Sequence, residues 1–342
     1  MHSDTPTANT ATDLDGLARP WLLADIGGTN ARFGWLAAGH TEPCHLETLP
    51  TAGHASPALA ARHYLALLAD RLGHDYTPPQ AAAWAVATAV GSDEVRFTNS
   101  AWAFSRSETR RLLGLQELLI LNDFEALALS LPHLLPHQVR RFGGPEHGLP
   151  GAALAVIGPG TGLGVAGLLP TAQGWVAIPG EGGHASLSAA DDFDAAVLAA
   201  VRRDHAHVSA ERLLSGIGLP VLHAAVARVM GLPATAKTAS EVVDGALQAH
   251  DPACGRTVDS FCALLGSFAG NVALTLGARG GVYIGGGIVP RLGERFLASQ
   301  FRERFEAKGR FQAYLQAVPT VLITDTLAAL TGAAQALRQQ RR

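Results

Sequence analysis

A strand that runs directly into two glycines is a segment that could contact a phosphate group. Residues 22–26 are apolar apart from Asp25, and Gly27, Gly28 and Thr29 follow them. Glycines allow a tight hairpin turn in which no Cβ separates the backbone N–H groups from a ligand, and such groups can bind phosphate. The Thr29 hydroxyl is a further donor, and the Asp25 carboxylate could hold Mg²⁺, directly or through water. An ordinary hairpin turn is the alternative.

The same arrangement occurs a second time. An apolar run at 154–157 is followed by Gly158-Pro159-Gly160-Thr161-Gly162 and by a second apolar run at 163–169. A third glycine segment, 285–287, ends the apolar run 282–284. Two matching strand–glycine–threonine–strand hairpins predict a duplicated fold, with a nucleotide held in the cleft between its halves.

Asn122 and Asp123 follow the apolar run 118–121 and precede a helical pattern. Ligands collect at the carboxyl ends of strands in α/β sheets. Both residue types are also good helix N-caps, which is the structural alternative. Because capping needs one polar residue and two are present, the second could face a ligand.

Two further segments carry acids. Glu181 and His184 lie three residues apart among glycines, and such a bare loop suits a polyhydroxylated ligand whose hydroxyls donate and accept. A surface turn with an incidental histidine is the alternative. Residues 209–216 are predicted to form a helix with Glu211 in its first turn, where the helix dipole favours a carboxylate without any function.

Two motif matches fail in their context. Residues 162–167 match GxGxxG, but a dinucleotide site requires a helix to open there, and the run continues apolar without helical period. Residues 231–238 are one residue short of a Walker A loop and follow a predicted helix at 224–230 instead of a strand. We interpret the second segment as an interhelical loop.

The elements that must position these residues follow from hydrophobic periodicity. Strands are expected at 22–26, 31–35, 82–90, 118–121, 154–157, 163–169 and 282–284, and helices at 56–72, 124–131 and 257–276. This order indicates an α/β protein with mixed sheets.

Composition narrows the class of protein. The chain has 342 residues, 48% of them hydrophobic and 16% charged, with a net charge of −3. These values predict globular domains and disfavour nucleic acid or an anionic membrane as partner. Three cysteines without a CxxC pair indicate neither a zinc cluster nor a disulfide framework and fit a reducing cytoplasm. Residues 1–18 read as a loose polar tail rather than a signal peptide, and no apolar run predicts a membrane helix.

Six segments, in order, resemble bacterial glucokinases of the hexokinase/actin-like ATPase superfamily. They are 24–32 (ADIGGTNAR), 121–124 (LNDF), 158–164 (GPGTGLG), 179–184 (PGEGGH), 209–216 (SAERLLSG) and 285–291 (GGGIVPR). The resemblance covers about residues 21–340. The related ROK sugar kinases and repressors carry a cysteine-rich zinc motif, which this chain lacks.

The resemblance implies a two-lobed actin-like ATPase (ribonuclease H-like) fold with duplicated mixed-sheet domains. A small α/β domain would comprise 19–133 and about 325–342, joined by the returning C-terminal helix. A large domain would comprise 134–324. The resemblance also implies a homodimer, and the cysteine usage predicts a cytoplasmic location.

The resemblance further implies the role of each segment. Asp123 would be the catalytic base. The sugar hydroxyls would be bound by Asn122, Asp123, Glu181, His184 and Glu211. ATP would be bound by Ala24, Asp25, Ile26, Gly27, Gly28, Thr29, Gly158, Gly160, Thr161 and Gly162 at its phosphates, with Asp25 near Mg²⁺, and by Gly285, Gly286 and Gly287 at its adenosine.

The implied reaction is ATP-dependent phosphorylation of glucose at its 6-hydroxyl. A kinase of another hexose is an alternative from the same class. A non-catalytic sugar-sensing regulator on this fold and an actin-like ATPase are alternatives from other classes.

Overall fold

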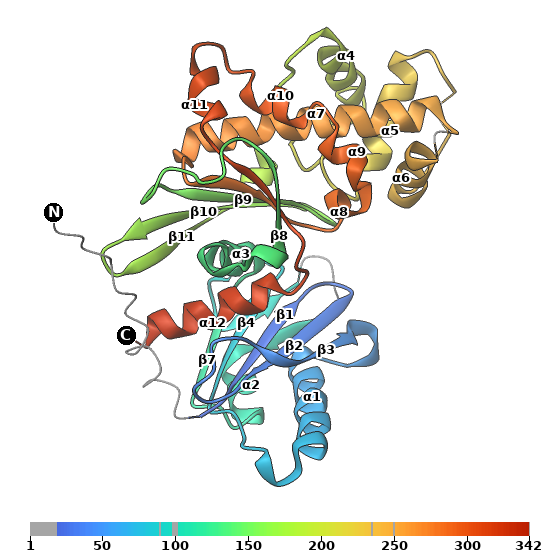
Figure 1. Cartoon of the computed structure of the whole chain (residues 1–342). Helices are drawn as coiled ribbons and strands as arrows, with labels where there is room; N and C mark the ends of the chain where they lie inside the picture. The colour runs from blue at the N-terminus through green and yellow to red at the C-terminus, as the bar shows by residue number, and fades with distance from the viewer. Residues whose placement is uncertain (1–18, 89, 98–101, 234, 249, 342) are drawn as a thin grey trace, which may run out of the picture. The chain divides into compact units, whose positions relative to one another are not determined.

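The computed structural model describes residues 19–88, 90–97, 102–233, 235–248 and 250–341, so the tail predicted at 1–18 lies outside the described residues. The chain divides into two compact units (Figure 1). Unit 1 comprises Met1–Ser130 and Leu327–Arg342, and unit 2 comprises Leu131–Thr326.

Unit 1 is built on a five-stranded mixed sheet in the order β3-β2-β1-β4-β7. The antiparallel part is β1 (Trp21–Ile26), β2 (Asn30–Leu36) and β3 (Cys44–Pro50), and the parallel part adds β4 (Ala81–Val86) and β7 (Glu117–Asn122) to β1. A small hairpin of β5 (Glu94–Arg96) and β6 (Ala103–Ser105), which the sequence did not predict, precedes α2 (Arg106–Leu112).

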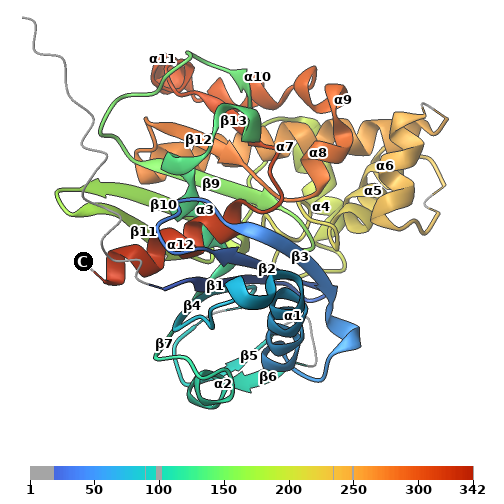
Figure 2. The same cartoon turned by 60° about the horizontal axis from the view of Figure 1, so that its bottom comes forward.

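The sheet of unit 1 is covered on both faces. Its strands alternate, so Leu22, Ala24 and Ile26 share one apolar cluster with α1 (Pro57–Leu72). Gly34, on the opposite face, lies against Leu330 of α12 (Ala328–Gln340). Figure 2 shows α1 and α12 with this sheet. Helix α1 begins where the sequence predicts, since the Ser56 side chain accepts a hydrogen bond from the N–H of Leu59.

Helix α12 packs against α3 (Asp123–Ser130), the helix that follows β7. At Gly332 the two backbones come so close that a Cβ would lie 1.6 Å from the carbonyl oxygen of Ala126. A glycine in a helix interior normally costs stability, so this one is explained by the close approach. The contact holds α3 in place, and α3 begins at Asp123.

Replacing Gly332 with alanine should destabilise unit 1 by about 3 kcal/mol, because backbone atoms must separate to admit the methyl group. The measurement is urea denaturation, followed by hydrogen exchange over 123–130. Gly255→Ala in α7 is the matched control, since its Cβ would have no neighbour closer than 3.6 Å, and it should be neutral or slightly stabilising. A Gly332→Ala variant as stable as this control would contradict the packing argument.

Unit 2 repeats the sheet of unit 1. Its strands follow the order β11-β10-β9-β12-β13-β8. Among the first five of these strands, the first two pairings are antiparallel and the next two are parallel, as in unit 1. The strands are β8 (Val139–Gly143), β9 (Leu154–Pro159), β10 (Leu163–Thr171), β11 (Gly174–Gly180), β12 (Gly281–Ile284) and β13 (Thr320–Ile323). The duplicated mixed-sheet architecture predicted from the two glycine hairpins is therefore present.

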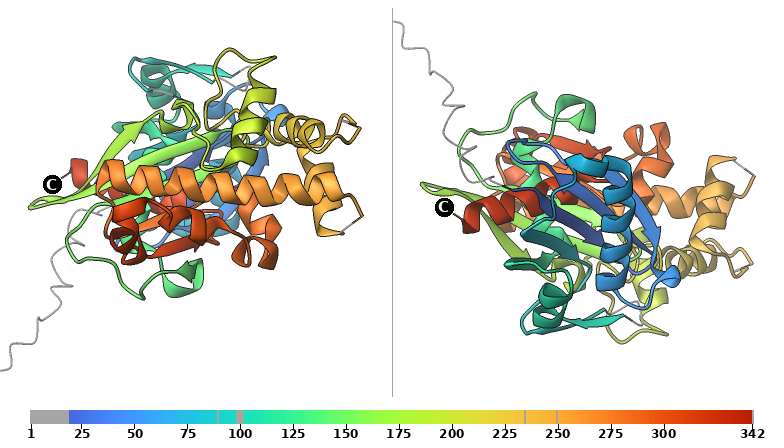
Figure 3. Two further views of the ribbon diagram at one scale, coloured as in Figure 1. Left: turned by 90° about the horizontal axis from the view of Figure 1, so that it is seen from above. Right: turned by 90° about the horizontal axis from the view of Figure 1, so that it is seen from below.

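The longest helix of unit 2 is α7 (Pro252–Leu276), the long orange helix in the left view of Figure 3. The other helices of unit 2 are α4 (Asp192–Val201), α5 (Leu219–Val229), α6 (Ala239–Leu247), α8 (Ile288–Leu292), α9 (Glu294–Leu297), α10 (Phe301–Glu306) and α11 (Gln312–Gln316). Of these, α5, α6 and α10 pack against α7. Helix α7 is long and apolar enough to cross a membrane, but 83% of its most apolar window is buried. Its Phe261, Leu264 and Leu265 lie in the core of unit 2, so α7 is a core helix.

Four sequence predictions of secondary structure need correction, and one of them is the helix predicted at 224–230, which begins at Leu219 and ends at Val229. The strand predicted at 82–90 ends at Val86, because the chain turns there and the N–H of Ala87 donates to the Ile26 carbonyl. Helix α7 begins at Pro252 rather than 257. The helix predicted over 209–216 is wrong, because successive turns occupy this segment. The N–H groups of Ala210, Glu211 and Gly216 donate to carbonyls elsewhere in unit 2, so a continuous helical ladder does not form.

Asp251 caps α7 and accepts hydrogen bonds from the N–H groups of Ala253 and Cys254. The backbone hydrogen bond from Cys254 is the largest cause that lowers the pKa of the Asp251 carboxyl to about 2, with contributions from Lys237 and the N–H of Ala253, although partial burial opposes the shift. Because the pKa is depressed in the folded state, the stabilisation is present above the unfolded value near 3.8 and is lost as pH falls toward 2.

Replacing Asp251 with alanine should therefore lower the free energy of unfolding by about 1 kcal/mol at pH 7. Urea denaturation at pH 7 and near pH 2.5 measures the difference, which should shrink at the lower pH. Asp251→Asn keeps a capping oxygen without the titrating charge and is the matched control. A difference between wild type and Asp251→Ala that stays constant with pH would sink this explanation.

Candidate active site

The glycine hairpin of unit 1 connects β1 to β2. The N–H of Gly27 donates to the carbonyl of Asn30 at 2.9 Å. Thr51 holds the turn from outside: its hydroxyl lies 2.9 Å from the Gly28 carbonyl oxygen and 3.0 Å from that of Thr29. Ala24 and Ile26 are fully buried, so only their backbone could contact a ligand, whereas Thr29 is exposed. Sequence reasoning missed Thr51, since nothing local marks a contact made across 22 residues.

Asp25 is the acidic residue of this hairpin, and its side chain is 14% exposed. Its Oδ2 accepts a hydrogen bond from Arg32 at 2.9 Å, the residue opposite it across the β1–β2 pair. Burial raises the pKa of the Asp25 carboxyl, and the charge of Arg32 acts in the opposite direction. A desolvated carboxylate that is compensated only in part is suited to a cation.

The described residues contain no group of three or more His, Cys, Asp or Glu side chains placed to hold a metal ion. Mg²⁺ is typically bound by one or two carboxylates together with substrate phosphates and water, rather than by a complete protein cage. A single acidic side chain beside a phosphate-type turn fits that pattern, so Asp25 fits a magnesium site completed by a nucleotide.

Asn122 and Asp123 lie at the end of β7. Asn122 Oδ1 accepts from the N–H of Phe124 at 2.9 Å, and its Nδ2 donates to the Thr88 carbonyl at 3.2 Å. Asn122 therefore caps α3, which is the structural alternative for one residue of the pair. Asp123 Oδ1 also accepts from the N–H of Phe124, at 3.0 Å, and its side chain is half-buried.

Strand register brings the two segments of unit 1 to one edge of the sheet. Ile26 pairs with Val86, and Val86 pairs with Asn122, in parallel ladders. The Gly27–Thr29 turn and the Asn122–Asp123 pair therefore emerge from the same carboxyl edge, where α/β sheets bind ligands.

The glycine hairpin of unit 2 connects β9 to β10, and the N–H of Gly160 donates to the Gly162 carbonyl at 2.9 Å. Thr161 is exposed, as Thr29 is in the first hairpin. None of the turn glycines Gly27, Gly160 and Gly162 has a positive φ, so a left-handed backbone is not the reason for glycine there. At Gly162 the requirement is space, because a Cβ would lie 2.5 Å from Glu211 Oε2.

The glycine segment 285–287 lies against this hairpin. The N–H of Gly285 donates to the Ile157 carbonyl at 2.8 Å. Gly286 has φ +77°, and a Cβ there would lie 2.4 Å from the carbonyl oxygen of Pro159. Both glycine segments follow the neighbouring parallel strands β9 and β12, so they lie together at one edge of the sheet of unit 2.

The acidic segments of unit 2 meet at the start of β10. Glu181 forms an isolated parallel β-bridge with Val165. Gly183 lies against the backbone of Leu163, where a Cβ on Gly183 would be 2.0 Å from the Leu163 carbonyl oxygen. The N–H of Glu211 donates to the Gly183 carbonyl at 2.8 Å, and Glu211 Oε1 is 4.0 Å from His184 Nδ1. The structure thus brings Glu181, His184 and Glu211 into one part of unit 2, beside the glycine hairpin.

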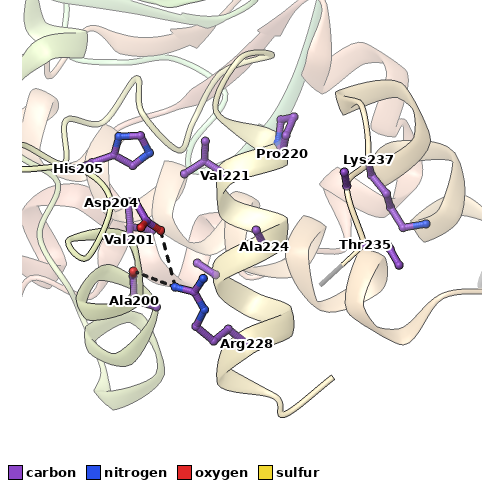
Figure 4. A pocket seen from close by; sticks show the side chains of 12 residues that line it. Ala200, Val201, Asp204, His205, Pro220, Val221, Ala224, Arg228, Thr235 and Lys237 are labelled. Atoms are coloured by element: carbon purple, nitrogen blue, oxygen red, sulfur yellow. Dashed lines mark hydrogen bonds and ion pairs between the residues drawn. The ribbon is translucent and has the colours of Figure 1, made fainter. Parts of the chain in front are cut away.

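A pocket of about 400 Å³ lies elsewhere in unit 2, between α4, α5 and residues 235–237 (Figure 4). Figure 4 shows Arg228 beside Asp204 and the Ala200 carbonyl. Lys237 belongs to the segment that partly matches a Walker A loop. Its Nζ lies 3.2 Å from Oδ2 of Asp251. Helix α5 precedes that segment, so the interhelical interpretation is confirmed, and the pocket contains none of the predicted site residues.

The match to known proteins covers nearly the whole chain. The sequence model described as Glucokinase matches residues 22–340. The chain belongs to the glucokinase family. It is 46% identical to a glucokinase of Aromatoleum aromaticum over 93% of this chain and 94% of that protein. It is 48% identical to a glucokinase of Chromobacterium violaceum over 93% of this chain and 90% of that protein.

The fold also matches a solved glucokinase structure. The crystal structure of glucokinase from an Antarctic psychrotroph superposes with a TM-score of 0.84 at 39% identity, covering 93% of this chain and 98% of that chain. The predicted actin-like ATPase fold of the glucokinase family is therefore confirmed for this chain.

Replacing Gly286 with alanine should weaken AMP-PNP binding about 10-fold, because the added Cβ strains the left-handed backbone and pushes the segment away from Pro159. Isothermal titration with AMP-PNP and Mg²⁺, and separately with glucose, measures the effect, and glucose affinity should be unchanged. Gly255→Ala is the control. Equal AMP-PNP affinity in wild type and Gly286→Ala would show that this glycine segment does not shape a nucleotide site.

Proposed function

We propose that this protein transfers the γ-phosphoryl group of ATP to the 6-hydroxyl of D-glucose. The observation that carries the proposal is the position of Asp123, whose carboxylate emerges from the same sheet edge as the Gly27–Thr29 turn. Membership of the glucokinase family supports the substrate pair.

In this proposal Asp123 is the general base. Its carboxylate accepts the proton of the sugar hydroxyl while that oxygen attacks the γ-phosphorus. Asn122 is held by its cap and its bond to the Thr88 carbonyl, so it can orient a hydroxyl beside Asp123 with little loss of side-chain freedom. Glu181, His184 and Glu211 of unit 2 bind the remaining hydroxyls as donors and acceptors.

The phosphates of ATP are bound mainly by backbone N–H groups and by the hydroxyls of Thr29 and Thr161. The chain has two lysines, and neither lies in a glycine turn: Lys237 pairs with Asp251, and Lys308 donates to Ser267. Catalysis then depends on positioning and charge neutralisation rather than on a lysine. Asp25 would hold Mg²⁺, and the ion, when bound, would neutralise phosphate charge.

Exclusion of water from the reacting atoms while the sugar is bound would limit hydrolysis of ATP. We also propose that the enzyme acts in the cytoplasm and is a homodimer. Light scattering after size-exclusion chromatography would test the dimer.

Replacing Asp123 with asparagine should lower kcat by about 10²–10⁴, because the base is lost while the shape is kept. A coupled assay for ADP measures turnover with glucose and with a panel of other hexoses. The exposed Asp75→Asn is the matched control and should leave kcat unchanged. Near-normal turnover of Asp123→Asn would refute the assignment of the base.

The wild-type protein in the same assay separates the alternatives. A higher kcat/KM for another hexose than for glucose would identify that hexose as the substrate. Sugar binding without ADP formation would indicate a sensing regulator. ATP hydrolysis indifferent to glucose would indicate an actin-like ATPase.

A further inference from the structure

We infer that Glu211 is a positioning residue for the nucleotide hairpin, defined as residues 158–163, in addition to its proposed contact with the sugar. One carboxylate would thereby couple sugar binding to nucleotide binding. The inference rests on the proposed function and deepens it.

The first observation is the bond between Glu211 and the hairpin. Glu211 Oε2 accepts a hydrogen bond from the N–H of Leu163 at 2.8 Å. Leu163 is the first residue of β10, and its side chain is 5% exposed. A charged acceptor makes this hydrogen bond stronger than a neutral one would. The absence of a side chain at Gly162 gives Oε2 its room.

The second observation is that the segment around Glu211, residues 209–218, is bonded to the hairpin on its own account. The N–H of Gly216 donates to the Gly160 carbonyl at 2.8 Å, and that of Ile217 donates to the Thr161 carbonyl at 3.3 Å. The Ser215 hydroxyl donates to the Glu211 carbonyl at 2.7 Å and fixes the turn. The segment and the hairpin are therefore joined by backbone hydrogen bonds as well as by the Glu211 carboxylate.

The third observation concerns the other side of the same segment. The N–H of Glu211 donates to the Gly183 carbonyl, and that of Ala210 donates to the Ala185 carbonyl, at 2.8 and 2.9 Å. Glu211 Oε1 lies 4.0 Å from His184 Nδ1, a side chain that is 62% exposed. One carboxylate oxygen thus holds the nucleotide hairpin, while the other faces the loop expected to bind the sugar.

This geometry gives a physical route for coupling. A sugar hydroxyl that donates to Oε1 fixes the carboxylate, and a fixed carboxylate fixes the Leu163 N–H and the turn before it. A ligand binds more tightly to a site whose order is already established. Coupling of this kind is reciprocal, so nucleotide should improve sugar binding by the same factor.

The test is the affinity for AMP-PNP with Mg²⁺, measured by isothermal titration without sugar and with saturating glucose. Without sugar, Glu211→Ala should weaken AMP-PNP about 10-fold. Glu211→Asp keeps the charge but is one methylene shorter, so its affinity for AMP-PNP should fall by a similar factor. Glu211→Gln keeps an acceptor for the Leu163 N–H and should restore most of the affinity. In wild type, glucose should tighten AMP-PNP at least about 5-fold, and this factor should approach 1 in Glu211→Ala.

A residue that only binds sugar would leave AMP-PNP affinity unchanged in Glu211→Ala when no sugar is present, and that result would overturn the inference. Equal weakening in all three variants, without rescue by glutamine, would also overturn it, because it would indicate general loosening. The exposed Glu303→Ala on α10 is the control and should match wild type. Wild-type ADP formation with glucose tests the proposed function separately, since the AMP-PNP comparison needs no turnover.

Discussion

The close approach of backbone segments at glycines is the constraint on which both parts of the proposed site depend. A methyl group at Gly183, Gly286 or Gly332 would lie within 2.4 Å of a carbonyl oxygen. Each of these glycines lies where a segment with candidate site residues meets a neighbouring element: the Glu181–His184 loop at β10, the third glycine segment at β9, and α3 at α12. Backbone atoms cannot rotate out of the way as side chains can, so the positions of these segments are set narrowly.

The two units share one strand order but carry different side chains at the edge of the sheet. In each, an antiparallel hairpin carries a glycine turn with an exposed threonine, and parallel strands bring a further segment to the same edge. In unit 1 that further segment is the Asn122–Asp123 pair, which supplies an acid. In unit 2 it is the Gly285–Gly287 segment, whose lack of side chains leaves room beside the hairpin. The repeated sheet therefore carries two similar glycine turns, and the segments beside them differ: the Asn122–Asp123 pair in unit 1, and the Glu181–His184 loop with Glu211 in unit 2.

Charge is placed sparingly around these turns. Asp25 is shielded from solvent and compensated in part by Arg32, and Glu211 uses one oxygen for a backbone N–H. Both carboxylates are thus oriented by the fold before any ligand arrives. Preorganised groups of this kind need little rearrangement when a charged substrate binds, which is the main source of electrostatic stabilisation in phosphoryl transfer.

The sequence by itself determined the elements whose signals are local. The strand–glycine–strand hairpins, the start of α1 at Ser56 and Pro57, and the duplicated sheet follow from residue order, because turn and cap preferences act over a few residues. Tertiary structure alone decided the conformation of 209–218, the bond of Thr51 to the first turn, and the contact of Glu211 with Leu163. These depend on partners distant in the sequence, whose carbonyls and N–H groups replaced the helical bonds that local propensity predicted.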